Sequence, residues 1–113
     1  MTRTNQLTHA CVNLLRAKGA FAWRNSTVGI FDPVKKQYRT NSDRQSIGAA
    51  DILAVYRGVP IAVEVKVGKD RQRPEQKRWA EALTAAGGIY IIAQDTTDAV
   101  IELLNKLDGQ TYE

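Results

Sequence analysis

Two carboxylates and one ammonium group stand close together in the middle of this chain, at Asp51, Glu64 and Lys66. Apolar runs rich in β-branched residues flank Arg57-Gly58, which is the pattern of a β-hairpin with a two-residue turn. With that turn, Asp51 lies directly opposite Glu64, and the Cβ atoms of such a pair are about 5 Å apart. Because strand side chains alternate between faces, Glu64 and Lys66 share one face. The pattern predicts a charged cluster at one end of an apolar hairpin.

Two kinds of chemistry fit this cluster. In the first, Lys66 forms an ion pair with Asp51 or Glu64 and the group is purely structural, as many ion pairs are. In the second, the carboxylates bind a hard divalent cation, which takes oxygen ligands from carboxylates, main-chain carbonyls, water and phosphate. Two carboxylates at this distance repel each other in a half-buried sheet, so a neighbouring positive charge is needed to stabilise them.

The rest of the chain supplies helices and strands that can position the hairpin. Hydrophobic spacing and end signals predict helices over residues 4–18, 74–86 and 96–107, and strands over 20–28, 51–56, 59–66 and 89–93. Residues 29–47 are expected to be loop with a short ribbon, and their polar part is expected to border a substrate groove. Strands 59–66 and 89–93 should be parallel neighbours, since a helix connects them. The predicted fold is an α/β sandwich around a mixed sheet flanked by helices.

The same patterns predict the burial or capping role of particular side chains. Gln76 falls on the apolar stripe of its helix, so its amide should be buried and hydrogen-bonded, most simply to the hairpin cluster. Trp23 is expected in the core, and the apolar strand 89–93 is expected to be buried on both faces. Asp95 is expected to cap the last helix, with Val100, Ile101, Leu104 and Leu107 facing inward.

Composition limits the classes of protein to consider. The chain has 113 residues, which suits one domain spanning residues 1–113. It has no apolar run long enough to cross a bilayer and no signal-peptide core, so we expect no membrane partner and a cytoplasmic location. Cys11, the single cysteine, cannot form an internal disulfide and fits a reducing compartment. The single histidine, His9, cannot build a zinc site.

Positive charge is mildly in excess, with a formal net charge of +4. One basic stretch, at residues 35–39, is explained equally well by phosphate contact or by solvation. A second begins three residues after Lys66, so a polyanion could touch both at once. Arg24 and Asn25, at a strand end, could contact phosphate, although solvation explains them equally well. The candidate nucleic-acid-binding residues are Arg24, Asn25, Lys69, Arg71, Arg73 and Lys77.

Segments around the charged cluster carry a resemblance to known nucleases. The resembling residues are 48–53, 57–58, 61–66, 76–79 and 87–90, and the likeness extends from the first helix to about Ala93. An acid entering one strand, Glu-x-Lys on the next and a following Gln-x-x-Trp helix resemble the PD-(D/E)XK nuclease superfamily. The closer resemblance is to its VRR-NUC family, of the stand-alone phage or bacterial type. The likeness implies a restriction-endonuclease-like αβββαβ core.

The resemblance also implies a reaction and its residues. Asp51, Glu64, Lys66 and Gln76 would form the catalytic set of a DNA endonuclease. Mg²⁺, or Mn²⁺ in its place, would be held by Asp51, Glu64 and the main-chain carbonyl of Val65, since an oxygen-only set suits these hard ions. Relatives suggest branched DNA, such as a four-way (Holliday) junction, cut by a homodimer in the cytoplasm of a bacterial or phage-infected cell. Two-fold symmetry fits paired nicks, because one small subunit with one site cuts one strand.

One departure from the family pattern lies on the first helix. Family members often carry an acid there facing the metal, whereas this chain has Asn5 and Gln6. An amide binds a divalent cation less well than a carboxylate, so we expect either lower activity or a carboxylate supplied from elsewhere. Two alternatives to the nuclease remain open: a non-catalytic nucleic-acid-binding module with a structural Asp/Glu/Lys cluster, and an interaction domain with no nucleic-acid role. The second would show no steep salt dependence of DNA binding.

Overall fold

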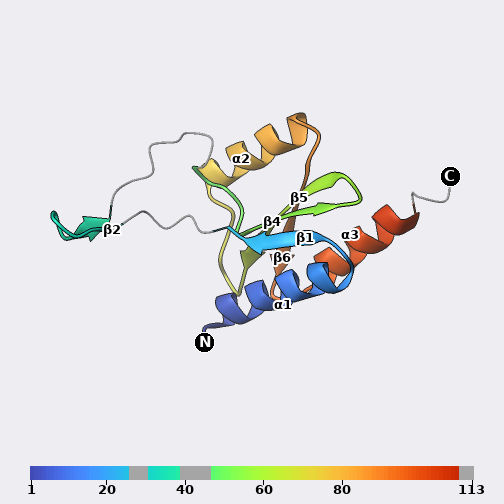
Figure 1. Cartoon of the computed structure of the whole chain (residues 1–113), viewed down its shortest axis with the longest axis horizontal. Helices are drawn as coiled ribbons and strands as arrows, with labels where there is room; N and C mark the ends of the chain where they lie inside the picture. The colour runs from blue at the N-terminus through green and yellow to red at the C-terminus, as the bar shows by residue number, and fades with distance from the viewer. Residues whose placement is uncertain (26–30, 39–46, 110–113) are drawn as a thin grey trace.

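The computed structural model describes residues 1–25, 31–38 and 47–109 of the chain (Figure 1). Its main sheet has the strand order β1-β4-β5-β6. The strands are β1 (Phe21–Arg24), β4 (Ile52–Tyr56), β5 (Val59–Lys66) and β6 (Ile89–Gln94). The helices are α1 (Arg3–Ala17), α2 (Pro74–Ala85) and α3 (Asp98–Gly109). α1 and α3 cover one face of the sheet and α2 lies on the other (Figure 1). This arrangement confirms the predicted α/β fold and its αβββαβ core.

The hairpin of β4 and β5 has the predicted register. The antiparallel pairing sets Ile52 beside Val63 and continues residue by residue to the turn. Arg57 and Gly58 have φ angles of 52° and 80°. Both values are in the left-handed region, which a two-residue type I′ turn requires because its twist matches that of the strands. The register places Asp51 directly before β4, level with the end of β5.

The strand on the other side of β5 is β6, and the two run parallel as predicted. Glu64 lies beside Ile92 and Lys66 beside Gln94. α2 forms the crossover between these strands and packs over β6. At the opposite edge, β1 pairs antiparallel with β4. β2 (Phe31–Asp32) and β3 (Gln37–Tyr38) form a separate antiparallel ribbon. The end of the predicted first strand and most of the polar stretch expected beside the groove lie outside the described residues.

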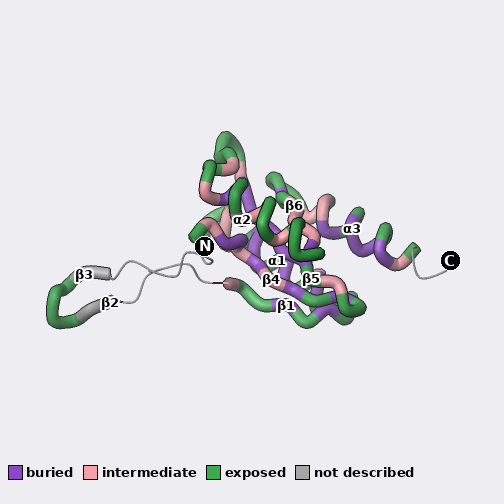
Figure 2. Tube along the Cα trace, turned by 90° about the horizontal axis from the view of Figure 1, so that it is seen from above, coloured by how far each residue is buried: buried purple, intermediate pink, exposed green. Residues whose placement is uncertain are grey.

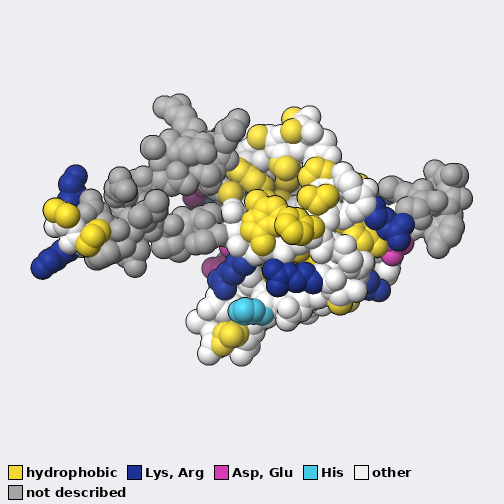
Figure 3. Space-filling view, in the orientation of Figure 1, with side chains coloured by type: hydrophobic (Ala, Val, Ile, Leu, Met, Phe, Trp, Pro, Cys, Tyr) yellow, Lys and Arg dark blue, Asp and Glu magenta, His cyan; other side chains and the backbone are white. Residues whose placement is uncertain are grey.

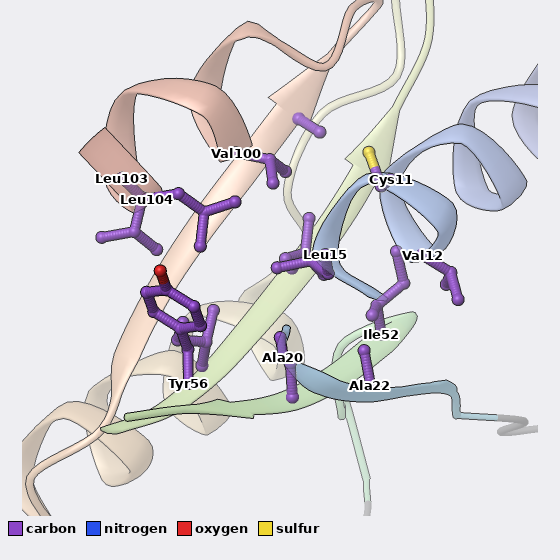
Figure 4. Packing of buried hydrophobic residues seen from close by; sticks show 14 of the residues in the cluster. Cys11, Val12, Leu15, Ala20, Ala22, Ile52, Tyr56, Val100, Leu103 and Leu104 are labelled. Carbon is purple, nitrogen blue, oxygen red and sulfur yellow. The ribbon is translucent and has the colours of Figure 1, made fainter. Parts of the chain in front are cut away.

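The core lies between the sheet and the pair α1 and α3 (Figure 4). Cys11 and Leu15 of α1 are fully buried against Ile52 of β4, and Val100 and Leu104 of α3 complete the layer. Figure 2 shows buried residues along the strands and on the inward sides of these helices. The thiol of Cys11 is buried in this layer, and burial raises its pKa to about 11. Among the described residues, no helix is long and apolar enough to cross a bilayer.

Three predicted side-chain positions are wrong, each because the neighbouring element lies elsewhere. Trp23 is 39% exposed, since it projects from the sheet face that carries α2, and α2 packs over β6 at the other edge. Ile92 is 36% exposed because β6 is an edge strand. Ile101 is 41% exposed and Leu103 is buried in its place, so the inward stripe of α3 is shifted.

The start of α3 also differs from its prediction. The helix begins at Asp98, two residues later than expected, and Asp95 does not cap it. The carboxylate of Asp95 instead accepts a hydrogen bond of 2.8 Å from the Gly68 amide and one of 3.1 Å from Arg3. These contacts lower the pKa of Asp95 and join the start of α1 to the loop that follows β5.

Candidate active site

Four polar side chains meet where β4 begins and β5 ends. Glu64, Lys66 and Gln76 are buried, with exposed fractions of 2%, 8% and 5%, and Asp51 beside them is half-buried. Glu64 and Lys66 come from alternate positions of β5 and point toward α2, whose first turn carries Gln76. The structure thus brings together all four residues predicted to be catalytic, although their position alone does not test that role.

The amide of Gln76 links the other groups. Its Oε1 accepts hydrogen bonds from Lys66 Nζ at 3.0 Å and from the backbone N–H of Arg73 at 2.9 Å. Its Nε2 donates to Glu64 Oε2 at 2.6 Å. Because two donors point at Oε1, the orientation of the amide is fixed, and Nε2 must face the carboxylate. Gln76 therefore hydrogen-bonds to one oxygen of Glu64 and to the ammonium group of Lys66. Its contact with the backbone of Arg73 fixes the start of α2.

The other oxygen of Glu64 is the unusual atom of the site. Within the described part of the chain, Glu64 Oε1 is buried and has no hydrogen-bond partner. Lys66 Nζ lies 3.5 Å from Oε2, so the ion pair also leaves Oε1 unpaired. A buried carboxylate oxygen without a donor is costly, and natural structures rarely keep one without a function or a bound ion. Burial and the nearby Asp51 raise the pKa of Glu64 to about 7, although Lys66 and Arg73 act to lower it.

Asp51 is held by the backbone on both sides of β4. Its Oδ2 accepts a hydrogen bond of 2.8 Å from the backbone N–H of Val65. Its carbonyl oxygen accepts one of 2.7 Å from the backbone N–H of Asn25, which continues the β1–β4 ladder by one residue. Asp51 Oδ1 is in neither contact. The two carboxylates and the main chain of Val65 therefore lie side by side.

This set of groups fits a hard divalent cation. Among the described residues Glu64 Oε1 is buried and unpaired, the charge of Asp51 acts on Glu64, and the main chain of Val65 donates to Asp51. Carboxylate and carbonyl oxygens are the ligands that Mg²⁺ and Mn²⁺ prefer, with water completing the shell. Within residues 1–25, 31–38 and 47–109 there is no cluster of three or more His, Cys, Asp or Glu side chains that could hold a metal. Among these described residues, the carboxylates at the site are those of Asp51 and Glu64.

The first helix provides an amide where relatives are expected to have an acid. Asn5 Oδ1 accepts a hydrogen bond of 2.7 Å from Arg24 Nη2, and Gln6 is exposed. Asn5 is therefore near the site end of β1, but its oxygen is engaged by an arginine.

The predicted nucleic-acid-binding residues lie on two segments, the end of β1 on one side and the loop before α2 with its first turns on the other. Arg24 and Asn25 border the site, and Arg73 contributes its backbone to Gln76 while its side chain pairs with Glu75 at 3.1 Å. Arg71 donates to the carbonyl of Asp70 at 3.0 Å. Lys69 and Lys77 are exposed on the loop before α2 and on its first turns. All six lie on segments that adjoin the cluster, and their contact with nucleic acid stays a prediction.

The pair Tyr90 and Gln72 also lies at the site and was not predicted from the sequence. Gln72 Nε2 donates to the Tyr90 hydroxyl at 3.1 Å, and the Tyr90 ring lies 6.1 Å from that of Trp79. Burial raises the pKa of Tyr90 to about 12, with smaller contributions from the charges of Glu64 and Asp51. This hydroxyl is therefore neutral near the carboxylates. The parallel pairing of β6 with β5 was the signal that places Tyr90 on the same face as Glu64.

Gly48 allows the first turn of α2 to lie close to the segment before β4. Its φ is 81°, and a Cβ atom there would collide with the carbonyl of Glu75 and approach the amide of Gln76. We expect Gly48→Ala to displace the first turn of α2 and destabilise the fold by about 2 kcal/mol, lowering Tm by roughly 5–10 °C. Thermal unfolding measures this. The matched control is Gly109→Ala, where an added Cβ meets nothing within 4 Å. Equal Tm values for the two variants would contradict the close packing.

Comparison with known proteins gives the fold a name. No protein-family model matches the sequence, and no curated protein matches it. A solved structure described as a "VRR_NUC domain" superposes with a TM-score of 0.63 at 20% identity, covering 93% of this chain and 97% of that chain. Another, described as a "VRR_NUC domain protein", gives a TM-score of 0.62 at 17% identity, covering 94% and 88%. These similarities confirm the predicted resemblance at the level of the fold: the chain has the fold of VRR_NUC domains.

Proposed function

We propose that this protein is a metal-dependent DNA endonuclease of the VRR-NUC family, which hydrolyses phosphodiester bonds at the Asp51–Glu64–Lys66 cluster. The observation that carries the proposal is the buried, unpaired Oε1 of Glu64 beside a second carboxylate and an ammonium group. A structural ion pair would be expected to satisfy both carboxylate oxygens. The shared fold with VRR_NUC domains supports the same conclusion.

Asp51, Glu64 and the carbonyl of Val65 would hold Mg²⁺ or Mn²⁺. The bound ion would supply a Lewis acid that neutralises charge on the phosphate and acidifies a water. Glu64 can offer Oε1 because Gln76 already engages its Oε2. Asp51 is positioned by the backbone amide of Val65 and does not depend on a flexible side-chain contact.

Lys66 would act on the phosphate or the attacking water, and Gln76 would position Lys66. The ammonium group of Lys66 has three donors, of which one reaches Gln76 Oε1 at 3.0 Å. A second lies toward Glu64, so one remains to donate to a phosphate oxygen or to orient the water. Fixed donors aimed at developing charge stabilise the transition state because they need no reorganisation. Gln76 is the positioning residue. Its hydrogen bonds fix where the Lys66 ammonium group and the Glu64 carboxylate lie relative to each other.

The basic residues near the site would bind the DNA backbone. Arg24 and Asn25 lie at one side of the cluster, and Lys69, Arg71, Arg73 and Lys77 lie on the loop and helix at the other. Lys and Arg contacts to phosphates release counterions, so binding should weaken steeply as salt rises. A protein with no nucleic-acid role would lack this dependence.

For the substrate, we propose branched DNA, with the four-way junction as the leading candidate, cut by a homodimer. The resemblance to stand-alone VRR-NUC proteins supports this choice. One site per chain also supports it, since symmetric cuts in two strands then need two copies. The test is incubation of the purified protein with labelled four-way junction and linear duplex, each with Mg²⁺, Mn²⁺ or EDTA, beside Asp51→Asn.

The result expected is junction cleavage with either metal, none with EDTA, and none by the variant. Cleavage of both substrates would keep the endonuclease and remove the junction preference. Binding without cleavage under every metal, unchanged in Asp51→Asn, would identify a non-catalytic binding module instead.

Cation binding should depend on pH through Glu64. Its carboxyl has a pKa of about 7 without metal, so it is mostly protonated at pH 6 and mostly ionised at pH 8. A metal binds the ionised form, so Mn²⁺ affinity should fall about tenfold from pH 8 to pH 6, with proton release on binding near neutral pH. Calorimetric titration in two buffers of different ionisation enthalpy measures both quantities. An affinity independent of pH over this range would contradict the role of Glu64 as a ligand.

A further inference from the structure

An exposed apolar surface lies on the sheet face that also carries the site. We name it the aromatic shelf; it consists of Phe21, Trp23, Leu53, Val55 and Pro60. Phe21 is 74% exposed, Trp23 39% and Val55 40%. The pairing of Phe21 with Val55 and of Trp23 with Leu53 places these side chains on one face. Figure 3 shows the apolar patch over β1.

The fold does not need this surface for its core. α1 and α3 pack on the opposite face, and α2 packs over β6, which leaves the shelf on β1 and β4 open. The rings of Phe21 and Trp23 have centroids 5.5 Å apart and are inclined by 55°, so each presents ring surface to solvent. Contiguous exposed apolar surface of this kind usually marks a binding site.

The shelf leads directly to the site. Asp51, Leu53 and Val55 are alternate residues and so share a face, and the backbone bond from Asn25 to Asp51 continues the β1–β4 ladder. Leu53 is one alternate position, about 7 Å, along the chain from Asp51, and Trp23 pairs with Leu53; Phe21, which pairs with Val55, is one such step further.

Positive charge borders the aromatic pair. Arg16 Nε donates to the carbonyl of Ala22 at 3.0 Å, and Ala22 lies between Phe21 and Trp23 in β1. Arg24 follows Trp23 and so projects to the α1 side of β1, where it donates to Asn5 Oδ1 at 2.7 Å; both arginines are exposed. Figure 3 shows Lys and Arg side chains along one border of the apolar patch. Aromatic rings beside guanidinium groups fit a ligand with both flat bases and phosphates.

We propose that the aromatic shelf binds unpaired nucleotides of the DNA, with bases stacked on Phe21 and Trp23 and the backbone along Arg16 and Arg24. The inference rests on the proposed function and, within the proposed class of branched DNA, favours branches with an unpaired segment beside the cut over a fully paired four-way junction. Bases in continuous duplex are stacked on each other and offer no free face. A second copy fits the shelf less well, because it would cover the approach to Asp51 and bring the arginines of two copies together.

The test is binding in EDTA, where no cleavage can occur. The probes are labelled single-stranded dT20, an abasic strand of equal length, and a duplex; the variants are Phe21→Ala and Trp23→Ala. Stacking contributes enough per base that each variant should bind dT20 about tenfold more weakly and the abasic strand equally well. Ile101→Ala, which removes an exposed apolar side chain from α3, is the matched control and should bind dT20 as the unmodified protein does.

Unchanged dT20 affinity in both variants, or equal losses on dT20 and the abasic strand, would overturn the inference. Sedimentation equilibrium covers the self-association alternative: a dimer that Trp23→Ala disperses while dT20 affinity is unchanged would assign the shelf to a second copy and also overturn it. Failure of the proposed function is distinguishable, because base-dependent binding in EDTA would persist in a protein that cuts nothing with Mg²⁺ or Mn²⁺.

Discussion

Glu64→Gln is expected to lose metal-dependent DNA cleavage by at least about a thousandfold and, without metal, to stabilise the fold at pH 8. The loss follows because an amide is a poor ligand for a hard cation, and loss of metal chemistry removes several kcal/mol from the transition state. The gain follows because the substitution removes a buried charge whose Oε1 has no partner among the described residues. The Gln76 Nε2 donor can still bond to the amide oxygen of the new side chain.

The gain in stability of Glu64→Gln should increase as pH rises. The pKa of Glu64 is raised from 4.5 to about 7 in the folded protein. Folding is therefore favoured by this group below pH 4.5, and that contribution is lost as pH rises through 7. Removing the charge should stabilise the fold by about 2–3 kcal/mol at pH 8 and by little at pH 5.

Thermal unfolding in EDTA at the two pH values, with cleavage assays beside it, measures both effects. Glu102→Gln, at an exposed position of α3, is the control for the change of residue type. A Glu64→Gln protein that cuts DNA normally would contradict the metal-ligand role. A Glu64→Gln protein destabilised equally at pH 8 and pH 5 would contradict the inference that ionised Glu64 is a buried, unpaired charge.

Lys66→Met is expected to lower the cleavage rate by about a hundredfold to a thousandfold, as removal of one donor to a transition-state oxyanion does elsewhere. Methionine keeps the length and apolar stem of lysine, so the loss reflects the ammonium group. The same change leaves Glu64 buried with its cationic neighbour gone, since Lys66 Nζ lies 3.5 Å from Glu64 Oε2. We therefore expect a loss of about 3 kcal/mol of stability at pH 8 in EDTA.

Mn²⁺ should restore most of that stability but not the cleavage rate, because the ion replaces the neutralising charge and not the donor. Single-turnover cleavage and thermal unfolding with and without Mn²⁺ separate the two roles. Lys106→Met, on an exposed position of α3, serves as the control. Cleavage by Lys66→Met at the unmodified rate would show that Lys66 is only a structural partner of Glu64.

The hairpin and its cluster could be predicted from sequence because local rules determine them. The Arg57-Gly58 turn fixes the register of β4 and β5, and the register fixes which side chains face each other. The burial of Gln76 followed from the helical stripe on which it lies. These features depend on residues close in the chain, so periodicity and turn chemistry were sufficient.

Positions that depend on how distant elements pack could not be read in the same way. Trp23 is a large apolar residue of the kind usually found in a core. It is exposed because α2 packs at the far edge of the sheet. Asp95 is of a residue type that caps helices, yet its carboxylate accepts hydrogen bonds from Gly68 and Arg3, which lie far from it in sequence. Tyr90 entered the site only through the parallel pairing of β6 with β5. The sequence contains no local signal for these choices.

If Glu64 Oε1 and Asp51 are ligands of a divalent cation, crystals of the protein grown at pH 8 with Mn²⁺ should show it by anomalous difference density. We expect one or more Mn²⁺ peaks in contact with Glu64 Oε1, Asp51 and the carbonyl of Val65, all absent in Glu64→Gln crystals. Well-ordered crystals in saturating Mn²⁺ without density there, and with Lys66 paired to both carboxylates, would assign the cluster to a structural ion pair.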